Sequence, residues 1–261
     1  MQMDIIKIKN ADYSRYKELL LRREQLRKEA HINHGLYVKE FGDLHLQIFE
    51  KQVACIRKKK LIAYYQAAIN RGGAINQAEI DAMLQREMEE YQKQLAAMAK
   101  ENEAARNISR ITDLDLLKIR RIYRKLAKQL HPDINPKTSE IPQLMELWNA
   151  VTTAYNSNNL ADMEELEVMV KNALETLEIG SMEIEIPDLD TKIKAVEADI
   201  ERIISTDPYQ YKFLLADYEA VEEKKKALEE QKKSYTDYEK QLDEVIEGIL
   251  KSGVKIIWKM N

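Results

Sequence analysis

The sequence predicts an all-α fold built from long helices, with at most a small β element. Of its 261 residues 33% are charged, and only 7 are Gly and 5 are Pro, a composition typical of long helices and coiled coils. All five prolines lie between Pro132 and Pro208, so the two flanking segments lack the strongest helix breaker. We therefore expect the long helices before residue 132 and after residue 208.

The N-terminal part, residues 1–111, is predicted to be a long helical hairpin with its turn near 72–76. The first helix is expected over about Asp12–Arg71, and a kink or break stays open near Asn33–Gly35, where Asn, His and Gly cluster. Gly72-Gly73 stands where a helix-ending glycine belongs. Two long amphipathic helices joined by so short a turn lie antiparallel.

The second helix of this hairpin is expected from Asn76 to about Arg106. Asn76 is followed three residues later by Glu79, which is the spacing of a capped helix start. Along the helix, apolar residues spaced alternately four and three apart predict a heptad-type seam: Leu84, Met88, Tyr91, Leu95 and Met98.

The C-terminal part, residues 179–261, is predicted to be a second helical hairpin or coiled coil. Asp207 with Pro208 in the first turn starts its last helix, which is expected to run to about Lys251. Its first helix carries a four-three seam of Leu189, Ile193, Val196, Ile200 and Ile203. The seam of its last helix includes Leu214, Tyr218, Val221, Leu228, Tyr235, Leu242, Val245 and Ile249. The seams fit pairing within one chain or between two copies, so a homo-oligomer stays open.

Three short stretches alternate or are β-branched, which is the pattern of a strand. They are Asp4–Ile8, Met182–Ile186 and Val254–Trp258. A five-residue apolar run is ambiguous between strand and helix, so these stretches predict only a minor sheet that would tie the long helices together.

The central part, residues 112–178, begins with an amphipathic helix expected over about Asp113–Leu130. Its apolar face holds Leu116, Ile119, Ile122, Leu126 and Leu130, and its opposite face holds Lys118, Arg120, Arg121, Arg124, Lys125 and Lys128. Like charges at i,i+4 repel by a few tenths of a kcal/mol, so six cations in eleven residues without an acid are costly to the isolated helix. This basic face is therefore expected to meet an acidic partner surface, although a merely solubilising face stays open.

The helix is followed by the loop His131-Pro132-Asp133-Ile134-Asn135-Pro136. Pro132 forces its predecessor out of helical geometry, and we expect Asp133 and Asn135 to face solvent beside the basic face. A third helix is expected over about Ser139–Asn156 and a strongly acidic fourth over about Leu160–Thr176. The apolar stripe of the third helix is Leu144, Leu147, Trp148, Val151 and Tyr155.

The segment from Ile119 to Asp133, Ile-Arg-Arg-Ile-Tyr-Arg-Lys-Leu-Ala-Lys-Gln-Leu-His-Pro-Asp, resembles the second helix and signature loop of J-domains, the DnaJ-type co-chaperones. Trp148-x-x-Val151-x-x-Ala154-Tyr155 resembles the third helix of that family. The resemblance covers about sixty residues, which would make the central part a J-domain-like module flanked by the two helical arms. It implies a core that includes Ile119, Leu126, Leu130, Trp148, Val151 and Tyr155.

The resemblance also implies a partner. J-domains bind DnaK-type (seventy-kilodalton heat-shock) chaperones and accelerate their ATP hydrolysis, so this chain would be a co-chaperone and not an enzyme, and would need no cofactor. The His131-Pro132-Asp133 loop would be the trigger, with Asp133 reaching an arginine of the partner. The residues that match docking positions are Arg120, Tyr123, Arg124, Lys125 and Asn135. The coiled-coil arms would bind a client or another protein partner.

Three other functions compete with this interpretation. An acid/base pair of His131 and Asp133 lacks a nearby nucleophile, and no metal-ligand spacing is present. Nucleic-acid binding through the basic face is not favoured, because Tyr123 is the only interleaved aromatic residue and the net charge is −4. A degenerate J-like scaffold stays open, because no Tyr-x-x-Leu-Gly opening helix is found.

The compartment expected from the sequence is the cytoplasm. The chain has one cysteine, Cys55, so it cannot form an internal disulfide, and it shows no signal peptide. No apolar run approaches the roughly 18 residues of a membrane span, so we expect no membrane association.

Overall fold

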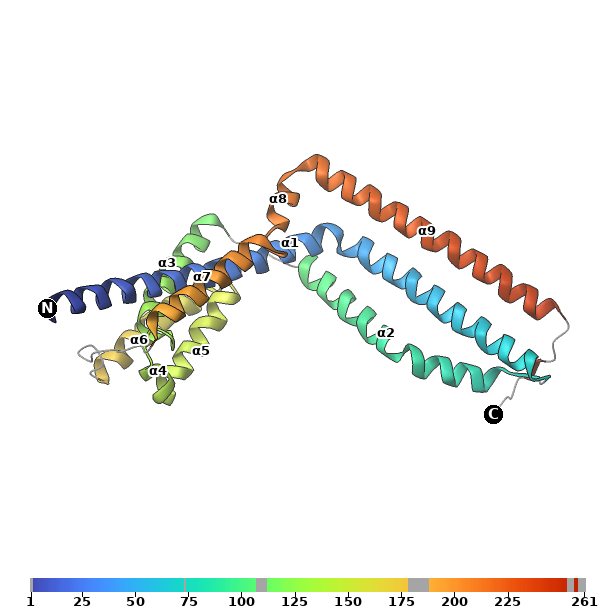
Figure 1. Ribbon diagram of the computed structural model, residues 1–261, viewed down its shortest axis with the longest axis horizontal. Coiled ribbons are helices and arrows are strands. Elements are labelled where there is room, and N and C mark those ends of the chain that lie inside the picture. Colours follow the sequence, from blue (N-terminus) through green and yellow to red (C-terminus); the bar gives the residue numbers. More distant parts are fainter. Residues whose placement is uncertain (1, 73, 107–111, 178–187, 253–255, 258–261) are drawn as a thin grey trace. The chain divides into compact units, whose positions relative to one another are not determined.

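The structure is a computed structural model that describes residues 2–72, 74–106, 112–177, 188–252 and 256–257 (Figure 1). These residues are almost entirely helical, which confirms the all-α prediction. The helices are α1 (Gln2–Asn70), α2 (Gln77–Arg106), α3 (Asp113–Leu130), α4 (Lys137–Glu140), α5 (Pro142–Asn156), α6 (Leu160–Thr176), α7 (Leu189–Ser205), α8 (Tyr211–Ala216) and α9 (Tyr218–Lys251). The strands β1 (Ile75–Asn76) and β2 (Ile256–Ile257) form a two-stranded parallel sheet.

The chain folds into two compact units that are interleaved along the sequence. Unit 1 combines Met1–Ile32 with Ser109–Gln210, and unit 2 combines Asn33–Ile108 with Tyr211–Asn261. This division differs from the three consecutive parts expected from the sequence. The reason is helix α1, whose first half supplies apolar side chains to unit 1 and whose second half supplies them to unit 2.

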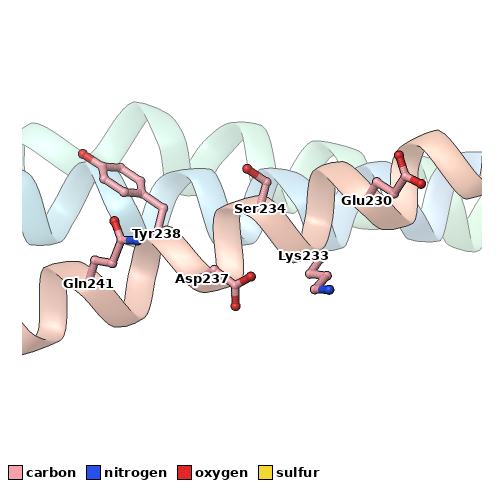
Figure 2. A pocket seen from close by; sticks show the side chains of 6 residues that line it. All are labelled: Glu230, Lys233, Ser234, Asp237, Tyr238 and Gln241. Atoms are coloured by element: carbon pink, nitrogen blue, oxygen red, sulfur yellow. The ribbon is translucent and has the colours of Figure 1, made fainter.

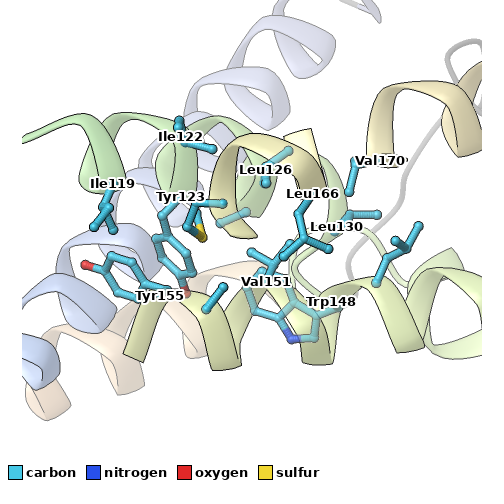
Figure 3. Packing of buried hydrophobic residues seen from close by; sticks show 14 of the residues in the cluster. Ile119, Ile122, Tyr123, Leu126, Leu130, Trp148, Val151, Tyr155, Leu166 and Val170 are labelled. Carbon is cyan, nitrogen blue, oxygen red and sulfur yellow. The ribbon is translucent and has the colours of Figure 1, made fainter. Parts of the chain in front are cut away.

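The main core of unit 1 lies between α3, α5 and α6 (Figure 3). Helices α3 and α5 are antiparallel, since Tyr123 stacks on Tyr155 with ring centroids 3.7 Å apart while His131, at the end of α3, meets Trp148 nearer the start of α5. Helix α6 packs against both. The residues expected in the core are all buried: Ile119, Leu126, Leu130, Trp148, Val151 and Tyr155.

A second cluster of unit 1 joins α1 to α7. Its buried members are Tyr16, Leu20, Leu26, Ile134, Ile193, Val196 and Ile200. The seam predicted on α7 is therefore buried against α1 and against the loop after α3. The C-terminal hairpin expected from the sequence is not formed, because the apolar face of α7 finds its partner in unit 1 while α9 belongs to unit 2.

In unit 2 the second half of α1 lies between α2 and α9 (Figure 1). Ion pairs connect α1 to both, for example Lys60 to Glu87 of α2 at 2.5 Å and Lys58 to Asp243 of α9 at 2.6 Å. The hairpin of α1 and α2 agrees with the sequence prediction. On the α2 seam Leu84 and Met88 are buried, whereas its other members, Tyr91, Leu95 and Met98, are half-buried.

Several predicted boundaries hold because local caps set them. Helix α1 ends just before Gly72, which has φ +67°. The Glu79 backbone N–H donates to the Asn76 side chain at 3.4 Å, as expected of a capped start. Thr112 caps α3 in the same way, through the Asp115 N–H at 3.1 Å.

Other expectations at the ends of elements were wrong. Helix α1 continues through Asn33–Gly35 without a break, and Asp4–Ile8 is helical instead of a strand. Met182–Ile186 lies outside the described residues, whereas Val254–Trp258 includes the strand β2. The last long helix starts at Tyr218 with Asp217 as its cap, because the Asp217 side chain accepts the Ala220 N–H at 3.1 Å.

Two helical glycines of unit 2 should respond oppositely to substitution. A Cβ on Gly42 would collide with the Asn102 side chain of α2, whereas nothing lies within 4 Å of a Cβ on Gly248. Gly42→Leu should therefore lower the free energy of unfolding by about 1–3 kcal/mol through overpacking. Gly248→Ala should raise it by roughly 0.5–1 kcal/mol, since Gly is a poor helix former. Urea unfolding of both variants checks the pair, and a stabilising Gly42→Leu would contradict the close approach.

Candidate functional site

The loop after α3 is held by backbone hydrogen bonds to its first residue. His131 ends the helix, and its own N–H still donates to the Ala127 carbonyl at 2.9 Å. The His131 carbonyl then accepts the N–H groups of Ile134 at 2.8 Å and Asn135 at 2.7 Å. These bonds close a tight turn after Pro132, so the segment leaves α3 in one defined direction.

The His131 side chain fixes the position of Asp133. The ring is only 7% exposed, and its edge contacts Trp148 with centroids 4.9 Å apart. Nδ1 accepts the backbone N–H of Asp133 at 3.1 Å. Burial lowers the pKa of His131, which favours the neutral ring that can accept this bond. His131 thus acts within the loop, and Asp133 is the residue that the loop presents.

Asn135 was expected to face solvent, and this expectation was wrong. Its side chain is only 4% exposed. Nδ2 donates to the Gln129 carbonyl at 2.9 Å, and Oδ1 accepts the Lys137 N–H at 3.2 Å. Because a buried amide must satisfy its polar atoms within the protein, Asn135 ties the last turn of α3 to the start of α4 and is not available to a partner.

Tyr123 is likewise a core residue. It is 3% exposed and lies between Trp148 and the stacked ring of Tyr155. Burial raises the pKa of its hydroxyl far above the ordinary value. A contribution of Tyr123 to docking, as the resemblance implies, can therefore be only indirect, through the packing of α3 on α5.

The basic face of α3 is partly exposed, but carboxylates of unit 1 already pair with it. Glu18 of α1 lies 2.7 Å from Arg124 and 2.8 Å from Lys128. Hydrogen bonding from Lys128, with the nearby charge of Arg124, lowers the pKa of Glu18. Two further pairs join Arg120 to Glu29 of α1 at 3.7 Å and Lys125 to Glu167 of α6 at 2.8 Å. The acidic surface that this face was expected to meet is supplied in part by the chain itself.

The Asp133 side chain is 48% exposed and faces α1. The guanidinium of Arg23 lies 3.8 Å from its carboxylate. Beside it the Tyr13 hydroxyl donates to the Ile134 carbonyl at 2.8 Å. Pro132 is half-buried. Helix α1 thus contacts Asp133 through Arg23, and contacts Arg120, Arg124 and Lys128 of α3 through Glu29 and Glu18.

Sequence reasoning missed the α1 residues of this site. One signal was present, since Glu18 and Glu29 are eleven residues apart, about three helical turns, and so share one face of α1. This spacing indicates a contact with the basic face only once α1 is known to lie against α3. Contacts between segments a hundred residues apart cannot be read from local periodicity.

Lys28 is a buried lysine of the site whose pKa is strongly lowered. It is 6% exposed, donates to the Tyr155 carbonyl at the end of α5, and lies 3.6 Å from the Tyr155 ring centroid. Burial, with the charge of Arg120 nearby, lowers the pKa of Lys28 to about 8. Cations are favoured at helix C-termini, which explains why a lysine is tolerated here.

Stability should therefore rise with pH above about 8. Between this folded-state pKa and the ordinary 10.5 of lysine, the unfolded chain holds a proton that the folded chain releases, so the free energy of unfolding increases with pH. Urea unfolding at pH 7 and pH 9.5 measures the gain, and Lys28→Met should give a smaller gain than the wild type. An equal gain in both proteins would show that Lys28 does not titrate in this range.

Other cavities of the described residues offer no stronger site. A depression of about 570 Å³ on α9 is lined by Glu230, Lys233, Ser234, Asp237, Tyr238 and Gln241, and Figure 2 shows that all six come from this one helix. In unit 2, His34 pairs with Glu101 at 2.8 Å and His45 with the Tyr37 hydroxyl at 2.9 Å. No group of three metal-ligating side chains occurs within the described part of the chain.

Comparison with known proteins identifies no protein similar to this chain. No protein-family model, no curated protein and no solved structure matches the chain. Among the helices that the structure describes, none combines the length and apolar character needed to cross a membrane.

Proposed function

We propose that unit 1 is a J-domain-like module that docks on a DnaK-type chaperone and stimulates its ATP hydrolysis. The observation that carries the proposal is the position of Asp133. It is half exposed at the end of the basic face of α3, and its backbone is fixed by the buried ring of His131. A carboxylate fixed in this way beside a row of cations can orient a partner that carries both an arginine and an acidic surface.

The antiparallel pair of α3 and α5 supports this proposal. The aromatic stack of Tyr123 on Tyr155, together with the contact of His131 with Trp148, joins the two helices along their length. The loop at its end is therefore preorganised, which lowers the entropy cost of binding. In this proposal the chain performs no covalent chemistry, and the partner's ATPase changes only through the differential affinity of the module for the partner's states.

Unit 2 would then supply the second interaction. Its long helices α1, α2 and α9 would bind a client or another protein, and the chain would act in the cytoplasm. The alternatives of a scaffold without ATPase stimulation and of nucleic-acid binding predict different outcomes in the same assay. The cations Arg124 and Lys128 already share Glu18, which weakens the case for a phosphate backbone.

Single-turnover ATP hydrolysis by a DnaK-type chaperone tests the proposal. The rate is measured with increasing amounts of the full chain, up to saturation. We expect the rate to increase at least about tenfold, which corresponds to about 1.4 kcal/mol of barrier. An unchanged rate at saturating chain would contradict the proposal and favour the scaffold.

A further inference from the structure

Helix α1 offers its own module the chemistry that the proposed partner would offer. Glu18 and Glu29 place carboxylates against Arg124, Lys128 and Arg120. An acidic chaperone surface would contact the same three cations. Both carboxylates lie on one side of α1, so they act on the basic face of α3 together.

Arg23 of the same helix lies against Asp133. Its guanidinium is 3.8 Å from the Asp133 carboxylate and 3.9 Å from Asp199 of α7. An arginine is also the group that Asp133 is proposed to reach on the partner. The first half of α1 thus carries two carboxylates and one arginine that each take a place assigned to the chaperone.

We infer that residues 13–29 of α1 mask the basic face and the loop of their own module, so that a chaperone must compete with them. This inference rests on the proposed function. Apolar contacts hold the mask in register, because Leu20 and Tyr16 are buried with Ile134 of the loop, and Leu21 is buried in the core of α3, α5 and α6.

The polar contacts between α1 and α3 can be replaced by contacts with a partner. A depression of about 520 Å³ lies beside the ion pair of Glu18 with Arg124, and its lining includes Arg22, Gln25 and Glu29 of α1. Glu29 is 3.7 Å from Arg120, beyond hydrogen-bond distance, and within the described residues the buried Arg120 Nε has no hydrogen-bond partner. The pairs of Glu18 with Arg124 and Lys128 are exposed, and exposed ion pairs contribute little each, so a partner with better geometry can replace them.

Masking has a defined kinetic signature. When only a fraction of the module is open, the apparent dissociation constant equals the intrinsic constant divided by that fraction. Weakening the mask should therefore lower the concentration of chain that gives half-maximal stimulation and leave the maximal rate unchanged. A variant that damaged the trigger itself would instead lower the maximal rate.

Glu18→Gln in the full chain tests this inference. It removes the charge that pairs with Arg124 and Lys128 but keeps the size of the side chain. Asp43→Asn is the matched control, because Asp43 of α1 makes a similarly exposed ion pair with Arg106 at 2.6 Å within unit 2. In single-turnover ATP hydrolysis by a DnaK-type chaperone, Glu18→Gln should lower the half-maximal concentration at least about threefold, and Asp43→Asn should leave it unchanged.

The possible results separate the inference from the proposed function. If the wild-type chain stimulates but Glu18→Gln has the same half-maximal concentration, the mask is wrong and the proposed function stands. An equal decrease in Asp43→Asn would also overturn the mask, because the effect would then come from net charge. If neither the wild type nor Glu18→Gln stimulates at saturation, the proposed function is wrong, and the mask has no site to cover.

Discussion

Replacing His131 with Gln should abolish the stimulation of the chaperone ATPase while the helical content of the chain stays unchanged. The His131 ring is buried against Trp148 and accepts the Asp133 N–H through Nδ1. A glutamine has an acceptor oxygen but no rigid ring, so it cannot fill the space beside Trp148 and hold Asp133 in the same geometry. The maximal single-turnover rate should fall by at least about tenfold, and circular dichroism should report an unchanged fold.

Gln129→Ala is the control for this substitution. Gln129 is exposed on the last turn of α3, and only its backbone carbonyl takes part in the loop, as acceptor for Asn135. The variant should stimulate as the wild type does. Stimulation that survives in His131→Gln would reject His131-Pro132-Asp133 as the trigger, and an equal loss in both variants would indicate a general effect on α3.

Replacing Tyr123 with Ala should have the largest effect on stability. The ring fills the space between Trp148 and Tyr155 in the core of unit 1, so its removal leaves a cavity among three helices. Large-to-small changes of buried aromatics lower the free energy of unfolding by about 3–5 kcal/mol. Urea unfolding, followed by the fluorescence of Trp148 and the other tryptophan, Trp258, measures the loss.

Tyr123→Phe separates packing from docking. The phenyl ring keeps the stack on Tyr155, so both stability and ATPase stimulation should stay close to the wild type. If Tyr123→Phe abolished stimulation while it unfolded at the wild-type urea concentration, the hydroxyl would take part in docking after all. That result would contradict the burial of Tyr123 described above.

The sequence predicts best those elements whose signals are local. The bounds expected for α3 and α6 agree with the structure, and both helices start at a local cap, Thr112 for α3 and Asn159 for α6. The continuity of α1 through Asn33–Gly35 was not predictable in this way. These residues have a weak helix propensity, but the helix on either side is packed into a different unit, and this tertiary packing overrides the propensity.

The candidate site was predicted only in part for a similar reason. Asp133 and the cations of α3 are visible in the sequence as a basic helix followed by a loop motif, and in the structure Asp133, Arg120, Arg124 and Lys128 each contact α1. Tyr123 and Asn135 lie close to the same motif, but whether a side chain faces a core or solvent depends on where α4 and α5 lie. Glu18 and Arg23 reach the site from more than a hundred residues away, and no local pattern reports such a contact.

The shared helix α1 also determines when the protein can fold during its synthesis. The first 32 residues leave the ribosome early, but their partners in unit 1 extend to Gln210. At about 5–20 residues per second, translation of residues 33–210 takes roughly 10–35 s. During this time the apolar face around Leu20 has no native partner and is open to chaperones or to aggregation. The first part of unit 2 must likewise wait for α9, which is translated after Gln210, so neither unit can complete its fold from a contiguous nascent segment.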